Sequence, residues 1–202
     1  MPIKLLGVRN DLKRRFEDID TMIYILNSNK KVDNQLILKS SLMLMLYNAV
    51  EGTMSNLLTD FFDIIHKKNI LISSLPYNLQ TTICNYWSRK NNSVSSTISV
   101  SNTTFELSYD ELTKYLKLFS GNLDSRSIRT VSESLGISLP DNVKEPFLLI
   151  VKNSRNKLAH GETRFNNACQ DITLKKMNDI RTNTQVFLES VILHYELFLN
   201  SI

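Results

Sequence analysis

The chain has 202 residues, which is enough for one domain with a sizeable buried core. Hydrophobic residues make up 42% of it and charged residues 22%, as in ordinary soluble globular proteins, and only five Gly and four Pro argue against a turn-rich β architecture. The formal net charge of +4 permits a polyanionic partner but does not require one.

The first third of the chain predicts two helices. Apolar residues recur every three or four positions over residues 9–30, and again over residues 35–67 in a wider stripe. The polar segment NSNKKVDN separates the two helices, which we expect to form an antiparallel hairpin. Gly52 lies inside the second stripe, where it costs about 1 kcal/mol relative to Ala, so we expect another backbone to cross closely there.

The middle third predicts shorter elements. Residues 73–90 read as a helix, and the Ser-, Asn- and Thr-rich run that follows reads as a loop with a short extended piece at most. Ser108 and Glu111 resemble a capping box that opens a helix through Leu118. A further helix is expected over 125–135, closed by Gly136.

The last third predicts two further core helices. Asp141 or Asn142 can cap the first of them, Pro146 suits its first turn, and Gly161 suits a left-handed C-terminal cap. The second runs from 172 to 202 with an amphipathic pattern. The predicted fold is therefore all-α: a single domain, 1–202, of four main helices with a small, partly helical insertion at about 70–140.

Several site classes have no support in the sequence. Cys84 and Cys169 lack the partners of a structural zinc site, and no glycine-rich phosphate loop or metalloprotease motif is present. No segment approaches a membrane span of about 20 apolar residues, and the N-terminus does not resemble a signal peptide. A cytoplasmic location without membrane contact is the expectation. His66 and His194 stand alone on helices and read as surface or packing residues.

The segment SRNKLAHGET, residues 154–163, is the strongest candidate site. Arg155 offers a forked set of donors that matches phosphate oxygens, and His160 can exchange a proton near neutral pH. Asn156 could orient either the phosphate or the imidazole. No acidic cluster accompanies them, so a phosphodiester substrate would be handled without a metal or other cofactor.

The spacing of Arg155 and His160 constrains how they can act together. Five residues on a continuous α-helix turn the side chain by roughly 140°, so the two would not share a face. They could converge if the helix unwinds at Ala159–His160, or if two chains meet about a two-fold axis. On spacing alone, an ordinary polar helix end remains an open alternative.

SRNKLAHGE at the end of a core helix resembles the R-x4-6-H motif of the HEPN superfamily of ribonucleases. The segments LYNAVEGTMSNLL (46–58) and FSGNLDSRSIRTVSESLGI (119–137) extend the resemblance, over about residues 10–195, to standalone HEPN-like nucleases of the MAE type. HEPN proteins paired with nucleotidyltransferase antitoxins often have a tyrosine shortly after the His, whereas this chain has Phe165 in that region.

The resemblance implies a homodimer that places two motifs around one cleft and cuts RNA without a metal. The 2′-hydroxyl would be the nucleophile, and a 2′,3′-cyclic phosphate the product. His160 would transfer protons, Arg155 would clamp the phosphate, and Asn156 would support them. Lys157 and Glu51 are candidate substrate-binding residues.

The resemblance also implies a toxin or a phage-defence (abortive-infection) effector, with an antitoxin or regulatory protein as a possible partner. Two other readings remain open: a non-catalytic HEPN-like module that binds RNA, a nucleotide or a protein, and a structural helical adaptor.

Overall fold

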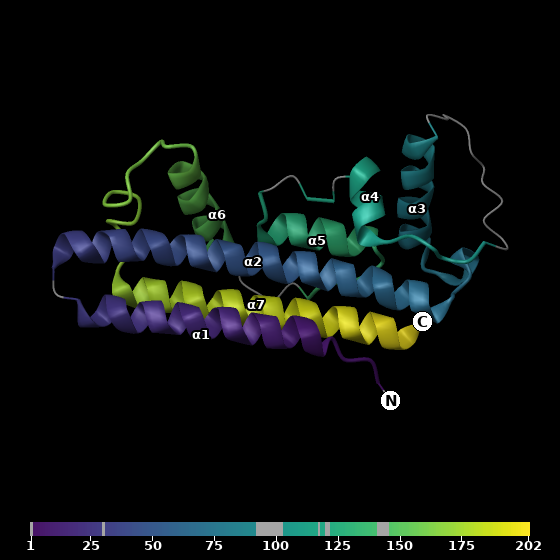
Figure 1. The fold of residues 1–202 in the computed structure, drawn as a ribbon, viewed down its shortest axis with the longest axis horizontal. Coiled ribbons are helices and arrows are strands. Elements are labelled where there is room, and N and C mark those ends of the chain that lie inside the picture. Colours follow the sequence, from purple (N-terminus) through teal and green to yellow (C-terminus); the bar gives the residue numbers. More distant parts are fainter. Residues whose placement is uncertain (1, 30, 92–102, 117, 120–121, 141–145) are drawn as a thin grey trace.

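The computed structural model describes residues 2–29, 31–91, 103–116, 118–119, 122–140 and 146–202. Three long helices lie side by side in it: α1 (Leu6–Ser28), α2 (Val32–Lys68) and α7 (Leu174–Ser201), each in contact with the other two (Figure 1). Four shorter helices lie above α2 in the view of Figure 1: α3 (Tyr77–Lys90), α4 (Tyr109–Tyr115), α5 (Ser125–Ser134) and α6 (Pro146–Ala159). Of these, α4 and α6 contact α2, and α3 contacts α4 and α5. The fold is the predicted all-α bundle, with α3–α5 between its second and third core helices.

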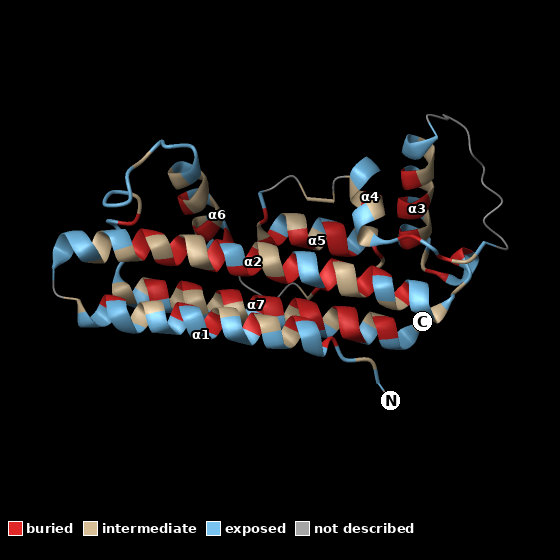
Figure 2. Ribbon diagram, in the orientation of Figure 1, coloured by how far each residue is buried: buried red, intermediate tan, exposed pale blue. Residues whose placement is uncertain are grey.

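Burial follows the amphipathic patterns of the long helices. Figure 2 shows exposed residues along the visible side of α1, whereas buried residues extend over most of α2, which carries neighbours on several sides. Phe61 of α2 packs edge-on against Phe62 and against Tyr195 of α7, with ring centroids 5.5 and 5.3 Å apart. These aromatic contacts join the two longest helices near their C-terminal ends.

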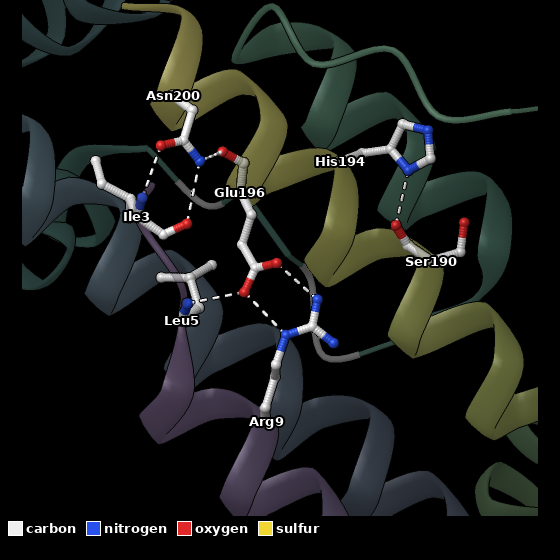
Figure 3. Close-up of polar contacts among 7 residues, drawn as sticks. All are labelled: Ile3, Leu5, Arg9, Ser190, His194, Glu196 and Asn200. Carbon is white, nitrogen blue, oxygen red and sulfur yellow. Dashed lines mark hydrogen bonds and ion pairs between the residues drawn. The ribbon is translucent and has the colours of Figure 1, made fainter. Parts of the chain in front are cut away.

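Polar contacts fasten the start of the chain to α7 (Figure 3). The Glu196 carboxylate accepts hydrogen bonds from the Leu5 amide at 2.8 Å and from the Arg9 guanidinium at 2.9 and 2.6 Å. Burial alone would raise the pKa of Glu196, but the bonds from Arg9 and Leu5 hold it below its usual value. The pair therefore stays ionised at neutral pH and fixes the register of α1 on α7.

The middle of the chain departs from prediction at two helix boundaries. The helix expected from residue 73 is instead a 3₁₀ turn, Ile72–Ser74, followed by α3 from Tyr77, because Pro76 disfavours helical geometry at the residue before it. The helix expected through Leu118 ends at Tyr115. Its N-cap was correctly predicted: the Ser108 hydroxyl accepts from the Glu111 amide at 3.2 Å.

The extended piece, the helix caps and the helix-ending glycines expected from the sequence can be compared with the structure. An isolated antiparallel bridge joins Leu71 to Thr104, while the alternating residues 94–100 and the expected caps Asp141 and Asn142 lie outside the described residues. Gly136 and Gly161 both adopt positive φ, +82° and +69°, as expected for glycines that end helices.

The expectation of a backbone crossing at Gly52 was wrong. The Arg15 guanidinium of α1, not a helix backbone, occupies the space above this glycine, and a Cβ there would lie 2.5 Å from the Arg15 Cζ. Asp11 holds Arg15 in place through an ion pair of 2.6 Å. The glycine thus accommodates a flexible side chain between α1 and α2.

Candidate functional site

The segment SRNKLAHGET forms the last turns of α6 and the cap that ends it. The Gly161 amide donates to the Leu158 carbonyl at 3.2 Å, and the Glu162 amide donates to the Lys157 carbonyl at 2.9 Å. These two bonds, with Gly161 in the left-handed conformation, make a Schellman cap that ends α6.

His160 still belongs to the helical part of the backbone. Its amide donates to the Asn156 carbonyl at 2.9 Å, which is the helical i→i−4 bond, and the chain leaves the helix only at Gly161. The break therefore falls after His160, too late to turn the imidazole toward Arg155. His160 is exposed at the end of α6, roughly 140° around the helix from Arg155.

Arg155 lies in a half-buried cluster between α6 and α2. Its Cζ is 4.5 Å from the centroid of the Tyr47 ring, and its Nη1 donates to the Asn156 Oδ1 at 3.0 Å. Its Nη2 lies 3.9 Å from the Glu51 Oε1, which is an ion-pair distance but too long for a hydrogen bond. The ring and the carboxylate hold the guanidinium in one region and leave it able to bind a further anion.

Tyr47 connects this cluster to the segment before α5. Its hydroxyl accepts a hydrogen bond from the Leu123 amide at 3.1 Å. Burial is the main cause that raises the pKa of Tyr47, and Glu51 raises it further, while the Leu123 bond and the charge of Arg155 act in the opposite direction. The phenol is therefore neutral at physiological pH and presents an uncharged ring to the Arg155 guanidinium.

A second connection joins the same segment to α6. The Asp124 carboxylate accepts from Lys152, one turn before Arg155, and from the Ser127 amide at 2.8 Å. The Ser127 hydroxyl in turn accepts from the Asp124 amide at 2.8 Å, which completes a capping box at the start of α5. Leu123 and Asp124 thus fasten α5 to both α2 and α6.

The family model described as MAE_28990-like HEPN matches residues 7–200, nearly the whole chain. The chain belongs to this HEPN family. Comparisons with curated proteins and with solved structures found no match.

This HEPN chain brings together three of the five residues singled out from the sequence. Arg155, Asn156 and Glu51 share the cluster described above. Lys157 and His160 are exposed and point to other sides of α6, and within the described part of the chain no hydrogen bond or ion pair joins His160 to Arg155.

Sequence reasoning missed Tyr47 of the HEPN chain. It is a fully buried tyrosine in the apolar stripe of α2, four residues before Glu51 and so on the same side of the helix. A buried phenol needs a hydrogen-bond partner, and that requirement is the signal that could have singled it out.

The segment after the motif is fixed to the HEPN bundle. The Ser40 hydroxyl of α2 donates to the Phe165 carbonyl at 2.6 Å, and Cys169 is buried beside Ser40 and Ser154. Burial raises the pKa of the Cys169 thiol more than these hydroxyls lower it, so the thiol stays protonated and unreactive. Cys169 is therefore a packing residue.

The two other histidines lie away from the motif. His194 uses its Nδ1 to contact the Ser190 carbonyl of its own helix at 2.7 Å (Figure 3), and His66 is exposed in the last turn of α2. Within the described ranges, none of the helices combines the length and the apolar composition that crossing a bilayer requires.

Proposed function

We propose that this chain is a metal-independent RNA endonuclease of HEPN type. The observation that carries the proposal is the Arg155 cluster: a guanidinium positioned by the Tyr47 ring at 4.5 Å and by Glu51 at 3.9 Å, on the helix that ends in an exposed His160. A guanidinium with unused donors suits a phosphate whose negative charge grows in the transition state.

In the proposed reaction the 2′-hydroxyl oxygen of RNA attacks the adjacent phosphorus. The new O2′–P bond forms as the P–O5′ bond breaks, which leaves a 2′,3′-cyclic phosphate and a 5′-hydroxyl. An imidazole accepts the proton of the 2′-hydroxyl, and an imidazolium gives a proton to the departing O5′. Arg155 stabilises the charge on the non-bridging oxygens. Asn156 holds the guanidinium by accepting a hydrogen bond from its Nη1.

A homodimer is part of the proposal. Because α6 stays helical as far as His160, the Arg155 and His160 of one chain diverge by roughly 140°. Two chains related by a two-fold axis can bring Arg155 of one chain and His160 of the other to a shared cleft. Such a cleft would hold two guanidinium groups and two imidazoles, enough for one acid and one base.

The biological setting in the proposal is the cytoplasm, where the chain would act as a toxin or a phage-defence effector held in check by an antitoxin or regulatory protein. Expression in a bacterial host is expected to arrest growth, and Arg155→Ala is expected to relieve the arrest. Growth arrest that persists unchanged in the Arg155→Ala variant would contradict this setting.

The direct test is an RNA cleavage assay in the presence of EDTA. Wild-type protein should cut total RNA and leave 2′,3′-cyclic phosphate ends, while His160→Ala should leave the RNA intact. His66→Ala is the matched control, because this exposed histidine lies at the far end of α2 from α6 (Figure 1). If RNA is bound equally by wild type and His160→Ala but cut by neither, the chain is a binding module and the nuclease proposal fails.

A further inference from the structure

A groove of about 440 Å³ lies between the start of α5 and the first half of α6. The α5 side carries Asp124 and Arg126, whereas the α6 side carries two apolar residues and a lysine. The groove is lined by Asp124, Ser125, Arg126, Pro146, Leu149 and Lys152. The R-x4-6-H motif does not include these residues, since all of them precede Arg155.

The α6 residues that line the groove end at Lys152, one helical turn before Arg155. Leu149, Lys152 and Asn156 are spaced by three and four residues, so they lie on one face of the helix. Lys152 precedes Asn156 by four residues, which corresponds to about 6 Å along the helix axis. A strand whose phosphate sits at Arg155 therefore reaches the groove within one or two nucleotides.

The charge of the groove suits a polyanion. Arg126 and Lys152 carry two positive charges against the one negative charge of Asp124. Arg126 is exposed at the rim. Lys152 has three N–H donors, of which the ion pair with Asp124 uses one, and the same pair fixes the ammonium beside the groove.

The apolar part of the groove suits a flat, weakly polar surface. Leu149 is 47% exposed, whereas Leu148 and Val151 on the same helix are buried. With Pro146 it forms an apolar patch next to cationic side chains. Nucleotides present this combination of a base face and an anionic backbone.

We propose that this groove holds the RNA nucleotides that flank the scissile phosphate on one side, with a base against Leu149 and Pro146 and backbone phosphates at Arg126 and Lys152. The inference rests on the proposed function, because it takes a phosphate at Arg155 as its starting point. It also assigns a role to the segment around α5: this segment supplies one wall of the substrate groove.

RNA binding measured in a His160→Ala background tests the groove without cleavage. A fluorescein-labelled single-stranded RNA is titrated at several salt concentrations and followed by anisotropy. Arg126→Ala should weaken binding about five- to tenfold and lower the slope of log K against log salt by about 0.7, the loss of one phosphate contact. Leu149→Ala should weaken binding severalfold with the slope unchanged, because it removes an apolar contact only.

Arg14→Ala is the matched control, because Arg14 is an exposed arginine on α1. The groove assignment is overturned if Arg126→Ala matches Arg14→Ala in both affinity and salt slope, even when the wild-type protein cuts RNA. Conversely, a wild-type protein that leaves RNA intact while the contrast between these two variants persists would end the nuclease proposal and support the groove. In the otherwise wild-type enzyme, Arg126→Ala should raise KM and leave kcat unchanged, since Arg126 does not touch the reacting atoms.

Discussion

Two clusters in this protein contain the same three kinds of group, a cation, a glutamate and a tyrosine, but arrange them differently. At the α3 end, Lys90 donates to Glu111 at 2.7 Å and to the Tyr86 hydroxyl at 3.0 Å, and that hydroxyl donates to Glu111 at 2.8 Å. At α6, Arg155 lies 3.9 Å from Glu51, and its Cζ lies over the Tyr47 ring, 4.5 Å from the ring centroid.

The difference distinguishes a cluster that stabilises the fold from one that can bind a ligand. In the Lys90 cluster every charge has its strongest partner inside the cluster, and the bond from Lys90 is the main cause that lowers the pKa of Glu111. In the Arg155 cluster the guanidinium makes one hydrogen bond within the described part of the chain, to Asn156, so most of its donors stay available.

Arg155→Lys should produce the largest loss of function. A lysine keeps the charge but cannot donate in a fork or stack flat on Tyr47, so cleavage should fall by about 100-fold or more. The melting temperature should change little, because the loose pair with Glu51 contributes little to stability. Single-turnover cleavage and thermal unfolding measure the two effects. Lys90→Met is the counterpart in the other cluster, and it should leave cleavage at the wild-type level.

Tyr47→Phe and Tyr86→Phe form a matched pair that separates the clusters. Each removes a buried hydroxyl, so each should cost about 1 kcal/mol, or about 2–4 °C in melting temperature. Tyr47→Phe should also reduce cleavage by about tenfold, because the Leu123 amide loses its acceptor and the ring under Arg155 loses its anchor. Equal activity in the two variants would limit Tyr47 to a role in stability.

Asp124→Asn tests the attachment of α5 to α6 through its pH dependence. Burial alone would raise the pKa of Asp124, but Lys152 and Ser127 hold it below its ordinary value of 3.8. The Asp124 carboxylate therefore makes its full contribution to the free energy of unfolding above pH 3.8. That contribution is lost as the pH falls through the lower pKa of the folded state. In urea unfolding, Asp124→Asn should be less stable than wild type by about 1 kcal/mol at neutral pH, with the difference shrinking as the pH falls below 3.8. A difference that stays constant over this range would mean that the carboxylate charge contributes nothing.

Gly52→Ala should have the smallest effect, although it lies next to Glu51. The added Cβ displaces the end of a flexible arginine, which is a small cost, while alanine favours the helix by up to about 1 kcal/mol. We expect the free energy of unfolding to change by less than about 0.5 kcal/mol and cleavage to stay at the wild-type level. Reduced cleavage in Gly52→Ala would indicate that α1 supports the Arg155 cluster through Arg15.

Periodicity predicted the long helices, and cap chemistry predicted the start of α4 and the ends of α5 and α6, because both signals are local in sequence. Gly161 is an example: its cap involves residues within five positions of it. The contacts that build the site are not local. Tyr47 and Leu123 are 76 residues apart, and Lys152 and Asp124 are 28 apart, so no periodic pattern marks them. Side-chain chemistry and the resemblance to HEPN proteins both singled out Arg155 and His160, but neither assigned a role to the residues that line the groove beside α5.

The contacts between Asn200 and Ile3 hold the two ends of the chain side by side. The Asn200 carboxamide accepts from the Ile3 amide at 2.7 Å and donates to the Ile3 carbonyl at 3.0 Å (Figure 3). A short linker could therefore join the ends, and new ends could be opened at an exposed position such as Asn166. In such a circular permutant α7 would be followed directly by α1, with the packing of the three long helices unchanged.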